Sequence, residues 1–197
     1  MQATSRRGRP QEADPRLVSR VALQLFEERG FDQVTMNQIA EAASVSRRTL
    51  FRLFPSKSDL VWEGLQDIRD ALEVHAASLR KEGLPLRVLL DELFVPVLRT
   101  LDEPEAAELA RRRLRLIAGA PALLYQKTLL QIEEVLATTL ETAGLPDDLP
   151  PSLVARSLVA GALAALLWWA ERGEGMTALD AARGGMKAMA LAGEGLP

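Results

Sequence analysis

The chain contains no cysteine and a single histidine, His75, among its 197 residues. A chain without cysteine can form no disulfide and no thiolate metal site, and one histidine cannot supply a histidine pair for a metal or a proton relay. We also find no glycine-rich phosphate loop and no nucleophile with a recognisable base partner. The composition therefore argues against an enzyme, and we expect no catalytic residue, no metal and no cofactor.

Long apolar stretches are missing as well. The longest apolar run, Leu158–Ala170, is shorter than the ~20 residues that cross a bilayer. The arginines near the N-terminus are not followed by the apolar segment of a secretory signal. With 48% apolar and 26% charged residues, the balance is that of an ordinary globular protein. These features predict a cytoplasmic protein.

Charge is unevenly distributed along the chain, although its net value is only −3. Residues 1–57 hold ten lysines and arginines against six aspartates and glutamates, a formal charge of +4. Residues 58–197 hold fourteen against twenty-one, a formal charge of −7. A basic end favours a nucleic-acid partner, but a modest imbalance of this kind is also common in proteins without one.

A helix-turn-helix pattern occupies residues 35–57. Thr35 can cap a first short helix whose apolar residues recur at helical spacing, and Ser46 can cap a second one. The first turn of the second helix carries Arg47 and Arg48 on the side away from its apolar stripe. Guanidinium groups bind guanine edges in pairs, and helix-turn-helix motifs place this turn against the bases. The pattern predicts a DNA-reading helix.

The rest of the chain also has helical periodicity, so the expected fold class is all-α. Residues 1–14 have little apolar content and suggest a flexible basic arm, which either lies along DNA or stays solvated. Its arginines are Arg6, Arg7 and Arg9. Pro96 is expected to kink or break its helix. Helices are expected over residues 15–30, 58–81, 86–101, 105–118, 121–143, 152–172 and 177–192.

The N-terminal third resembles the DNA-binding domain of TetR-family transcriptional regulators. The residues that carry this resemblance are Leu25–Phe31, Thr35, Ile39, Ala40, Val45–Phe54, Ser56, Lys57 and Leu60. The resemblance implies an all-α homodimer that reads a palindromic operator and binds a small ligand in a larger C-terminal domain. It divides the chain into the arm 1–14, a DNA-binding domain 15–57, and a ligand-binding and dimerisation domain 58–197.

The same resemblance implies roles for individual residues. Thr35 and Lys57 would contact phosphates, and Phe51 and Arg52 would lie against the backbone or the bases. The remaining predicted base readers are Ser46, Arg47, Arg48 and Thr49.

Two positions depart from the family pattern. Ser44 stands where glycine is preferred for a left-handed turn, and Leu53 stands where a phosphate-contacting tyrosine is common, so we expect no contact from Leu53.

A second arginine cluster, at residues 111–115, is more ambiguous. On a helix these side chains point in several directions, and salt bridges with Glu105 or Glu108 are the favoured interpretation. The alternative is that Arg112 or Arg115 reaches an acidic ligand group. The order of residues 112–123 also resembles the C-terminal domain of mycofactocin-type regulators, which implies an acyl-CoA-like effector. Tyr125, Trp168 and Trp169 are further ligand candidates, although packing in the core or an interface is their default role.

The last two expected helices suggest a dimer interface. Residues 152–172 are apolar on nearly all sides, so a partner protomer can cover the side that the core does not. Together with the resemblance, the sequence favours a ligand-responsive homodimeric repressor that binds a palindromic operator through the helix 46–54. Its release by a small hydrophobic or acyl-CoA-like effector is expected. The alternative is a helical module that binds another protein and does not bind DNA specifically.

Overall fold

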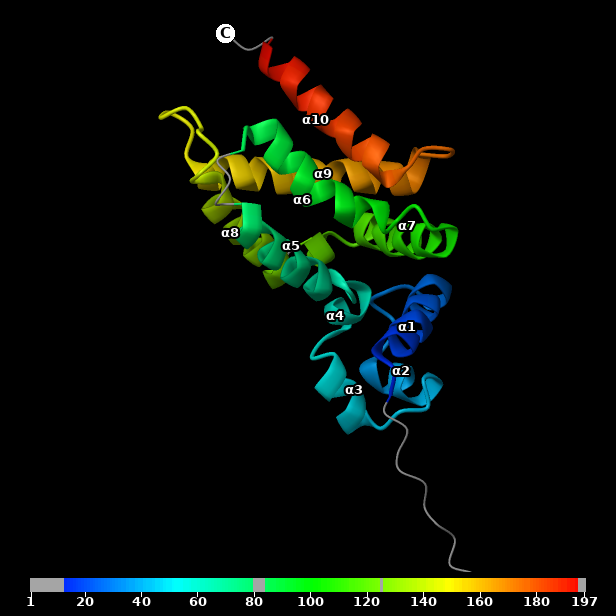
Figure 1. Ribbon diagram of the computed structural model, residues 1–197. Coiled ribbons are helices and arrows are strands. Elements are labelled where there is room, and N and C mark those ends of the chain that lie inside the picture. Colours follow the sequence, from blue (N-terminus) through cyan, green and yellow to red (C-terminus); the bar gives the residue numbers. More distant parts are fainter. Residues whose placement is uncertain (1–12, 80–83, 125, 195–197) are drawn as a thin grey trace, which may run out of the picture. The chain divides into compact units, whose positions relative to one another are not determined.

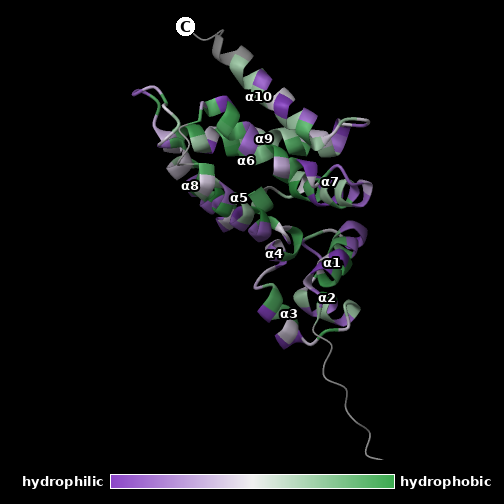
Figure 2. Cartoon of the chain, in the orientation of Figure 1, coloured by the Kyte–Doolittle hydropathy of each residue, from purple (hydrophilic) through white to green (hydrophobic). Residues whose placement is uncertain are grey.

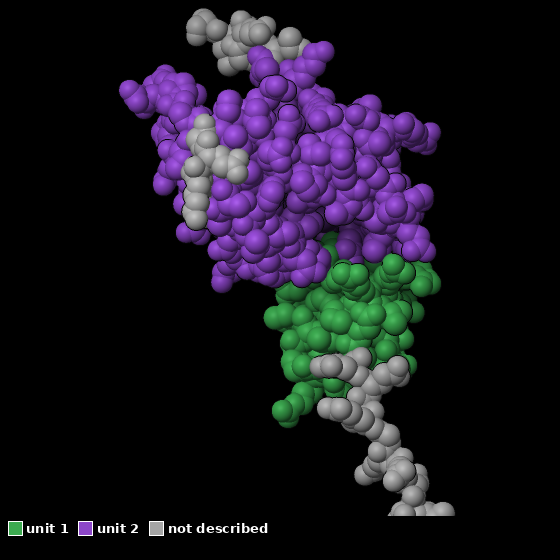
Figure 3. Space-filling model, in the orientation of Figure 1, with its two compact units in different colours: residues 1–63 green, residues 64–197 purple. Residues whose placement is uncertain are grey.

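The computed structural model describes residues 13–79, 84–124 and 126–194, and all regular elements in these ranges are helices (Figure 1). The prediction of an all-α fold is confirmed. The contacts divide the chain into two compact units, residues 1–63 and residues 64–197 (Figure 3). The predicted arm arginines Arg6, Arg7 and Arg9, and also Tyr125, lie outside the described residues.

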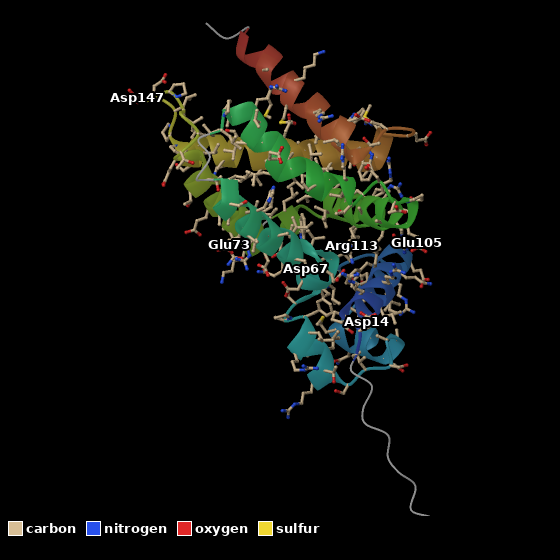
Figure 4. The ribbon with its side chains drawn as sticks, in the orientation of Figure 1. Asp14, Asp67, Glu73, Glu105, Arg113 and Asp147 are labelled. Atoms are coloured by element: carbon tan, nitrogen blue, oxygen red, sulfur yellow. The ribbon has the colours of Figure 1, made fainter. Side chains whose placement is uncertain are left out.

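The described part of unit 1, residues 13–63, contains four helices: α1 (Pro15–Arg29), α2 (Met36–Ala42), α3 (Arg47–Leu53) and α4 (Lys57–Val61). The first helix begins and ends where its sequence predicts. The Asp14 side chain accepts a hydrogen bond from the Arg16 amide at 2.9 Å, and Asp14 is labelled at the start of α1 in Figure 4. Gly30 follows the helix with φ of 86°, a conformation that favours glycine.

The core of unit 1 joins all four helices. Phe26, Ile39, Leu50 and Leu60 are almost fully buried, one from each helix. Ser19 is buried too, and its hydroxyl donates to the Leu60 carbonyl at 2.8 Å, which fastens α1 to α4. A buried hydroxyl is tolerated because it is hydrogen-bonded. This small core holds the helix-turn-helix pair in a defined orientation.

Unit 2 contains the remaining helices of the described chain. Its core cluster draws buried side chains from α5, α6, α8 and α9, with Leu93, Leu136 and Leu140 among the most deeply buried. Its elements are α5 (Leu65–Leu79), α6 (Leu86–Arg99), α7 (Pro104–Gly119), the 3-10 turn η1 (Pro121–Leu124), α8 (Lys127–Leu140), α9 (Pro151–Arg172) and α10 (Ala178–Glu194).

Two predicted helices are divided in the structure. The range 58–81 is not one helix, because α4 ends at Val61 and α5 begins at Leu65. Gly64 between them has φ of 88°, which a right-handed helix cannot contain. The range 121–143 is likewise divided into the 3-10 turn η1 and helix α8. In both cases a local turn replaces the continuous helix that apolar periodicity predicted.

At Pro96 a helix is continuous where a kink or break was expected, because α6 includes this residue without interruption. Of the two expectations at Pro96, the break is therefore wrong, and the kink stays a prediction. A proline leaves the carbonyl four residues earlier, here that of Glu92, without its helical partner. Pro96 and Glu92 are both exposed, so water can satisfy that carbonyl. The solvent-facing position explains why the helix tolerates the proline.

Helix α9 is the one described helix that is long and apolar enough to cross a membrane by length and composition. This differs from the expectation that the apolar run was too short, because the helix has 22 residues and extends well beyond the run. Figure 2 shows the hydrophobic residues along it. Only 28% of its most apolar window is buried inside the chain. Much of its apolar surface therefore has no cover within the single chain.

Candidate functional site

Helix α3 presents a basic face that the core of unit 1 positions. Leu50 and Phe54 are 0% and 5% exposed and anchor one side of the helix in that core. Arg47, Arg48 and Arg52 are exposed. No acidic residue lies between Glu41 and Asp59 in the sequence, so the positive charge on α3 is not neutralised locally. This geometry suits an anionic partner that fits along a helix.

Side-chain caps hold the two helices of the motif at their starts. The Thr35 hydroxyl accepts from the Gln38 amide at 3.3 Å, and the Gln38 side chain accepts from the Thr35 amide at 2.8 Å. Ser46 accepts from the Thr49 amide at 3.0 Å, and the two hydroxyls lie 2.8 Å apart. Both predicted caps are confirmed. A shared hydrogen bond also orients the Ser46 and Thr49 hydroxyls at the start of α3.

The turn between α2 and α3 depends on a serine in a left-handed conformation. Ser44 has φ of 54°, and it is the one non-glycine residue with positive φ in the described part of the chain. The Ser44 amide donates to the Glu41 carbonyl at 3.0 Å, and the Val45 amide donates to the Ala40 carbonyl at 2.9 Å. These two bonds define a Schellman motif, which normally carries glycine at this position. The predicted left-handed turn is present despite the serine.

Replacing Ser44 with glycine is expected to stabilise unit 1. A side chain in the left-handed region costs roughly 1 kcal/mol or more, and glycine avoids that cost. We expect a gain of up to about 1 kcal/mol, because glycine also raises the entropy of the unfolded chain. Urea unfolding followed by circular dichroism measures it. Ser44→Ala is the control, since it keeps the strain, and equal stability of the two variants would contradict the explanation.

Lys57 is engaged within unit 1. Its ammonium donates to the Phe31 carbonyl at 2.8 Å and lies 4.5 Å from the centroid of the Phe31 ring. Phe31 in turn packs on Phe26, with ring centroids 5.0 Å apart. Lys57 therefore ties the start of α4 to the connection after α1. Its predicted phosphate contact stays a prediction, because a phosphate would share or replace the Phe31 carbonyl as its partner.

In unit 2, Arg111 forms hydrogen bonds with carbonyls at and just after the C-terminal end of α9. Its guanidinium donates to the carbonyls of Trp169, Gly173 and Met176 at 2.6, 2.9 and 3.3 Å. It also lies 3.9 Å from the centroid of the Trp169 ring, a cation–π contact. The Trp169 carbonyl also accepts from the Gly173 amide at 3.0 Å. The C-terminal end of a helix carries partial negative charge, so the Arg111 guanidinium stabilises the end of α9. The sequence alone does not distinguish Arg111 from its neighbouring arginines.

Arg115, one turn along α7, makes a similar contact. Its Nε donates to the Ala170 carbonyl at 2.9 Å, and its Nη1 lies 3.7 Å from a Glu108 carboxylate oxygen. The expectation of a salt bridge with Glu108 is thus confirmed for Arg115. About half of the Arg115 side chain, 49%, remains exposed. Arg112 is half-buried on the same helix. The predicted ligand roles of both arginines stay predictions.

The two adjacent tryptophans of α9 have opposite environments. Trp169 is 1% exposed, and its indole Nε1 donates to the Met176 carbonyl at 2.8 Å. Trp168 is 45% exposed. Consecutive helical residues point about 100° apart, so one ring packs inward while the other faces out. A ligand or partner can reach Trp168 directly, whereas Trp169 already belongs to the packed core.

Two further features bear on ligand binding, one in unit 2 and one across the described chain. A surface hollow of about 550 Å³ lies on α8 and α9, lined among others by Leu130, Leu153, Glu133 and Arg156. Of the predicted ligand residues that the structure describes, Arg112, Arg115, Trp168 and Trp169, none lines this hollow. Across residues 13–79, 84–124 and 126–194, no group of three or more histidine, cysteine, aspartate or glutamate side chains is placed to hold a metal ion.

A capped helix-turn-helix with an exposed basic second helix, followed by a larger helical unit, is the architecture of a DNA-binding regulatory protein. Two family models match the chain. Residues 19–63 match the model of bacterial regulatory proteins of the tetR family, and residues 84–190 match the model of the MftR C-terminal domain. The chain belongs to the TetR family and is a DNA-binding transcriptional regulator.

A curated relative supports both matches. The putative mycofactocin biosynthesis transcriptional regulator MftR of Mycobacterium tuberculosis is 33% identical over 174 residues, which cover 84% of each protein. The resemblances to TetR-family and mycofactocin-type regulators are therefore confirmed. Because relatives of this kind are named as transcriptional regulators, the expectation of a regulator over an enzyme gains support.

Solved structures show the same fold at lower identity. Thermus thermophilus FadR, a TetR-family transcriptional repressor in complex with lauroyl-CoA, has a TM-score of 0.58 and 22% identity, covering 88% of this chain and 92% of that one. SmeT, the repressor of the Stenotrophomonas maltophilia multidrug efflux pump SmeDEF, has a TM-score of 0.60 and 21% identity, covering 92% and 90%. These likenesses bear on the fold alone.

Proposed function

We propose that this regulator is a homodimeric repressor that binds a palindromic operator through the helix 46–54 and is released by a small effector. The observation that carries the proposal is the exposed pair Arg47 and Arg48 on α3, in a stretch without acidic residues. Two such helices in a dimer would enter successive major grooves, about 34–36 Å apart. Effector binding would favour a dimer whose two helices no longer match that spacing.

The proposed contacts divide into base readers and phosphate contacts. Arg47 and Arg48 read base edges, because exposed guanidinium groups on the first turn of α3 reach guanine acceptors. The Ser46 and Thr49 hydroxyls, 2.8 Å apart at the start of α3, are assigned to the same groove. Arg52 lies one turn further along α3. Phosphate contacts are assigned to Thr35, Lys57 and the arm residues Arg6, Arg7 and Arg9. Phe51 and Arg52 lie against the DNA backbone or the bases.

The proposed dimer uses α9 and α10. Exposed residues on α9 recur at helical spacing along one face: Leu153, Ser157, Ala160, Ala164 and Trp168. Met189 on α10 is 39% exposed, although it is apolar. A second protomer would cover this surface, as paired helices do in a four-helix bundle. A regulator in the cytoplasm must reach DNA, so the apolar surface of α9 is buried by a partner protomer and not by lipid.

In domain terms, residues 15–57 supply the DNA contacts, and residues 58–197 bind the effector and dimerise. Residues 58–63 pack with the first compact unit, so α4 serves as the last supporting helix of the DNA-binding part. The arm 1–14 adds phosphate or minor-groove contacts. The protein acts by binding alone, and neither part is assigned a catalytic role.

The effector is proposed to be acyl-CoA-like. Support comes from the MftR-type C-terminal domain and from FadR, a protein of the same fold whose solved structure contains lauroyl-CoA. Arg112 and Arg115 would hold an acidic group of the ligand, and Tyr125 would line its apolar part. Trp168 would line it only where the dimer leaves its ring uncovered. Trp169 would contribute only where effector binding opens the packing around it, since it is buried in this structure.

A two-stage binding experiment tests this function. Genomic fragments retained by the protein define the operator, and fluorescence anisotropy on a labelled duplex then measures release by acyl-CoA of increasing chain length. We expect at least one long-chain acyl-CoA to raise the dissociation constant tenfold or more, which corresponds to a coupling free energy of about 1.4 kcal/mol. Free coenzyme A is the control. If no chain length releases the duplex, the effector assignment fails while DNA binding stands.

A further inference from the structure

Phe51 is an exposed aromatic side chain on the basic face of α3. It is 44% exposed, although a phenyl group has no polar atom to solvate. The core does not require it there, because Leu50 and Phe54 already anchor the helix. Single exposed apolar side chains are common on protein surfaces. What distinguishes Phe51 is its position beside exposed arginines on the basic face of α3.

The neighbours of Phe51 define what it can contact. Residues three and four apart lie side by side on a helix, so Arg48 and Arg47 both flank Phe51. All three side chains are exposed on α3. A partner that fits them together must offer negative charge, hydrogen-bond acceptors and an apolar group within one helical turn. The major groove of DNA offers all three, and its apolar group is the C5-methyl of thymine.

We propose that Phe51 is a specificity-determining residue that reads a thymine methyl in each operator half-site. One helical turn is about 5.4 Å, and successive bases on a strand are about 3.4 Å apart. The thymine therefore lies one or two base pairs from the guanine that Arg47 or Arg48 binds. This inference rests on the proposed placement of α3 in the major groove.

Uracil substitution tests the methyl contact directly, since uracil pairs like thymine but lacks the methyl group. Each thymine of the selected operator is replaced in turn, in one or both half-sites, and binding is measured by anisotropy at constant salt. Wild type is expected to lose about fourfold in affinity at one position in one half-site, and about fifteenfold with both half-sites changed. The other thymines should have no such effect.

The variant Phe51→Ala tests the same contact from the protein side. It should bind the thymine operator more weakly than wild type and show no further loss when that thymine becomes uracil. Phe51→Leu keeps an apolar side chain and should retain part of the discrimination. Because Phe51 is exposed, the thermal unfolding of Phe51→Ala should match wild type, which confirms that a binding change is not a folding defect.

Three results would each overturn the proposal. The first is a wild-type operator affinity that uracil leaves unchanged at every position, and the second is a half-site with no thymine within two base pairs of a guanine. The third is a loss of affinity on uracil substitution that is as large for Phe51→Ala as for wild type. In each case the variant in which alanine replaces Arg47 and Arg48 shows which hypothesis has failed. If this variant no longer binds the operator, α3 still lies in the major groove and only the thymine contact of Phe51 is rejected. If its binding is unchanged, the major-groove placement is rejected as well.

Discussion

Replacing Arg47 and Arg48 together with alanine is expected to weaken operator binding at least about a thousandfold. Each good arginine–guanine contact contributes roughly 1–3 kcal/mol of discrimination, and a dimer would make four such contacts. Even the lower values, if additive, total about 4 kcal/mol. Both side chains are exposed, so the fold should be unaffected. Anisotropy on the selected operator measures the change, and sedimentation confirms the dimer.

A charge-matched control separates base reading from general electrostatics. Arg87 and Arg99 are both exposed on α6, in unit 2, and their replacement with alanine removes the same net charge. We expect the control to change operator affinity by less than about threefold, because it removes only long-range attraction, which salt screens. A stable dimer of the Arg47 and Arg48 variant with full operator affinity would instead favour the helical protein-interaction module.

Replacing Trp169 with alanine is expected to cost unit 2 about 3–5 kcal/mol in the free energy of unfolding. That range is typical of truncating a fully buried tryptophan, because a cavity is left where the ring was. The change also removes the surface on which the Arg111 guanidinium rests and the indole bond to the Met176 carbonyl. Urea and thermal unfolding, followed by far-ultraviolet circular dichroism, measure the loss.

Trp168→Ala is the matched control for the same helix. Trp168 is 45% exposed, so its removal leaves no internal cavity and should cost less than about 1 kcal/mol within the protomer. Its effect should appear in dimerisation, as a raised dissociation constant in sedimentation experiments at decreasing concentration. Equal losses of protomer stability for the two variants would show that Trp169 is not the packing element described here.

Much of the site could be predicted from sequence because its determinants are local. Thr35 and Ser46 cap helices through bonds to residues three positions away, and such caps depend on side-chain chemistry and spacing alone. Ser44 was expected in a left-handed turn, and it has that conformation. The basic face of α3 follows from the helical period, which separates Arg47 and Arg48 from the buried Leu50.

Other features could not be predicted because they depend on contacts distant in sequence. Four arginines share residues 111–115, and helical phase alone does not say which of them meet the end of α9. Arg111 does, through carbonyls 58 and 62 residues away, and so does Arg115, through the Ala170 carbonyl. The break at Gly64 is similar, because glycine is tolerated inside helices and packing decides whether its positive φ is used.

The amino-acid sequence by itself determined the helical class, the capped motif at residues 35–57 and its basic face, since these depend on interactions within one or two helical turns. The tertiary structure alone decided that Arg111 holds α9, that Trp169 is buried while Trp168 is exposed, and that α6 continues through Pro96. The physical reason is that helix pairing selects which face of each helix is buried, and local periodicity permits several choices.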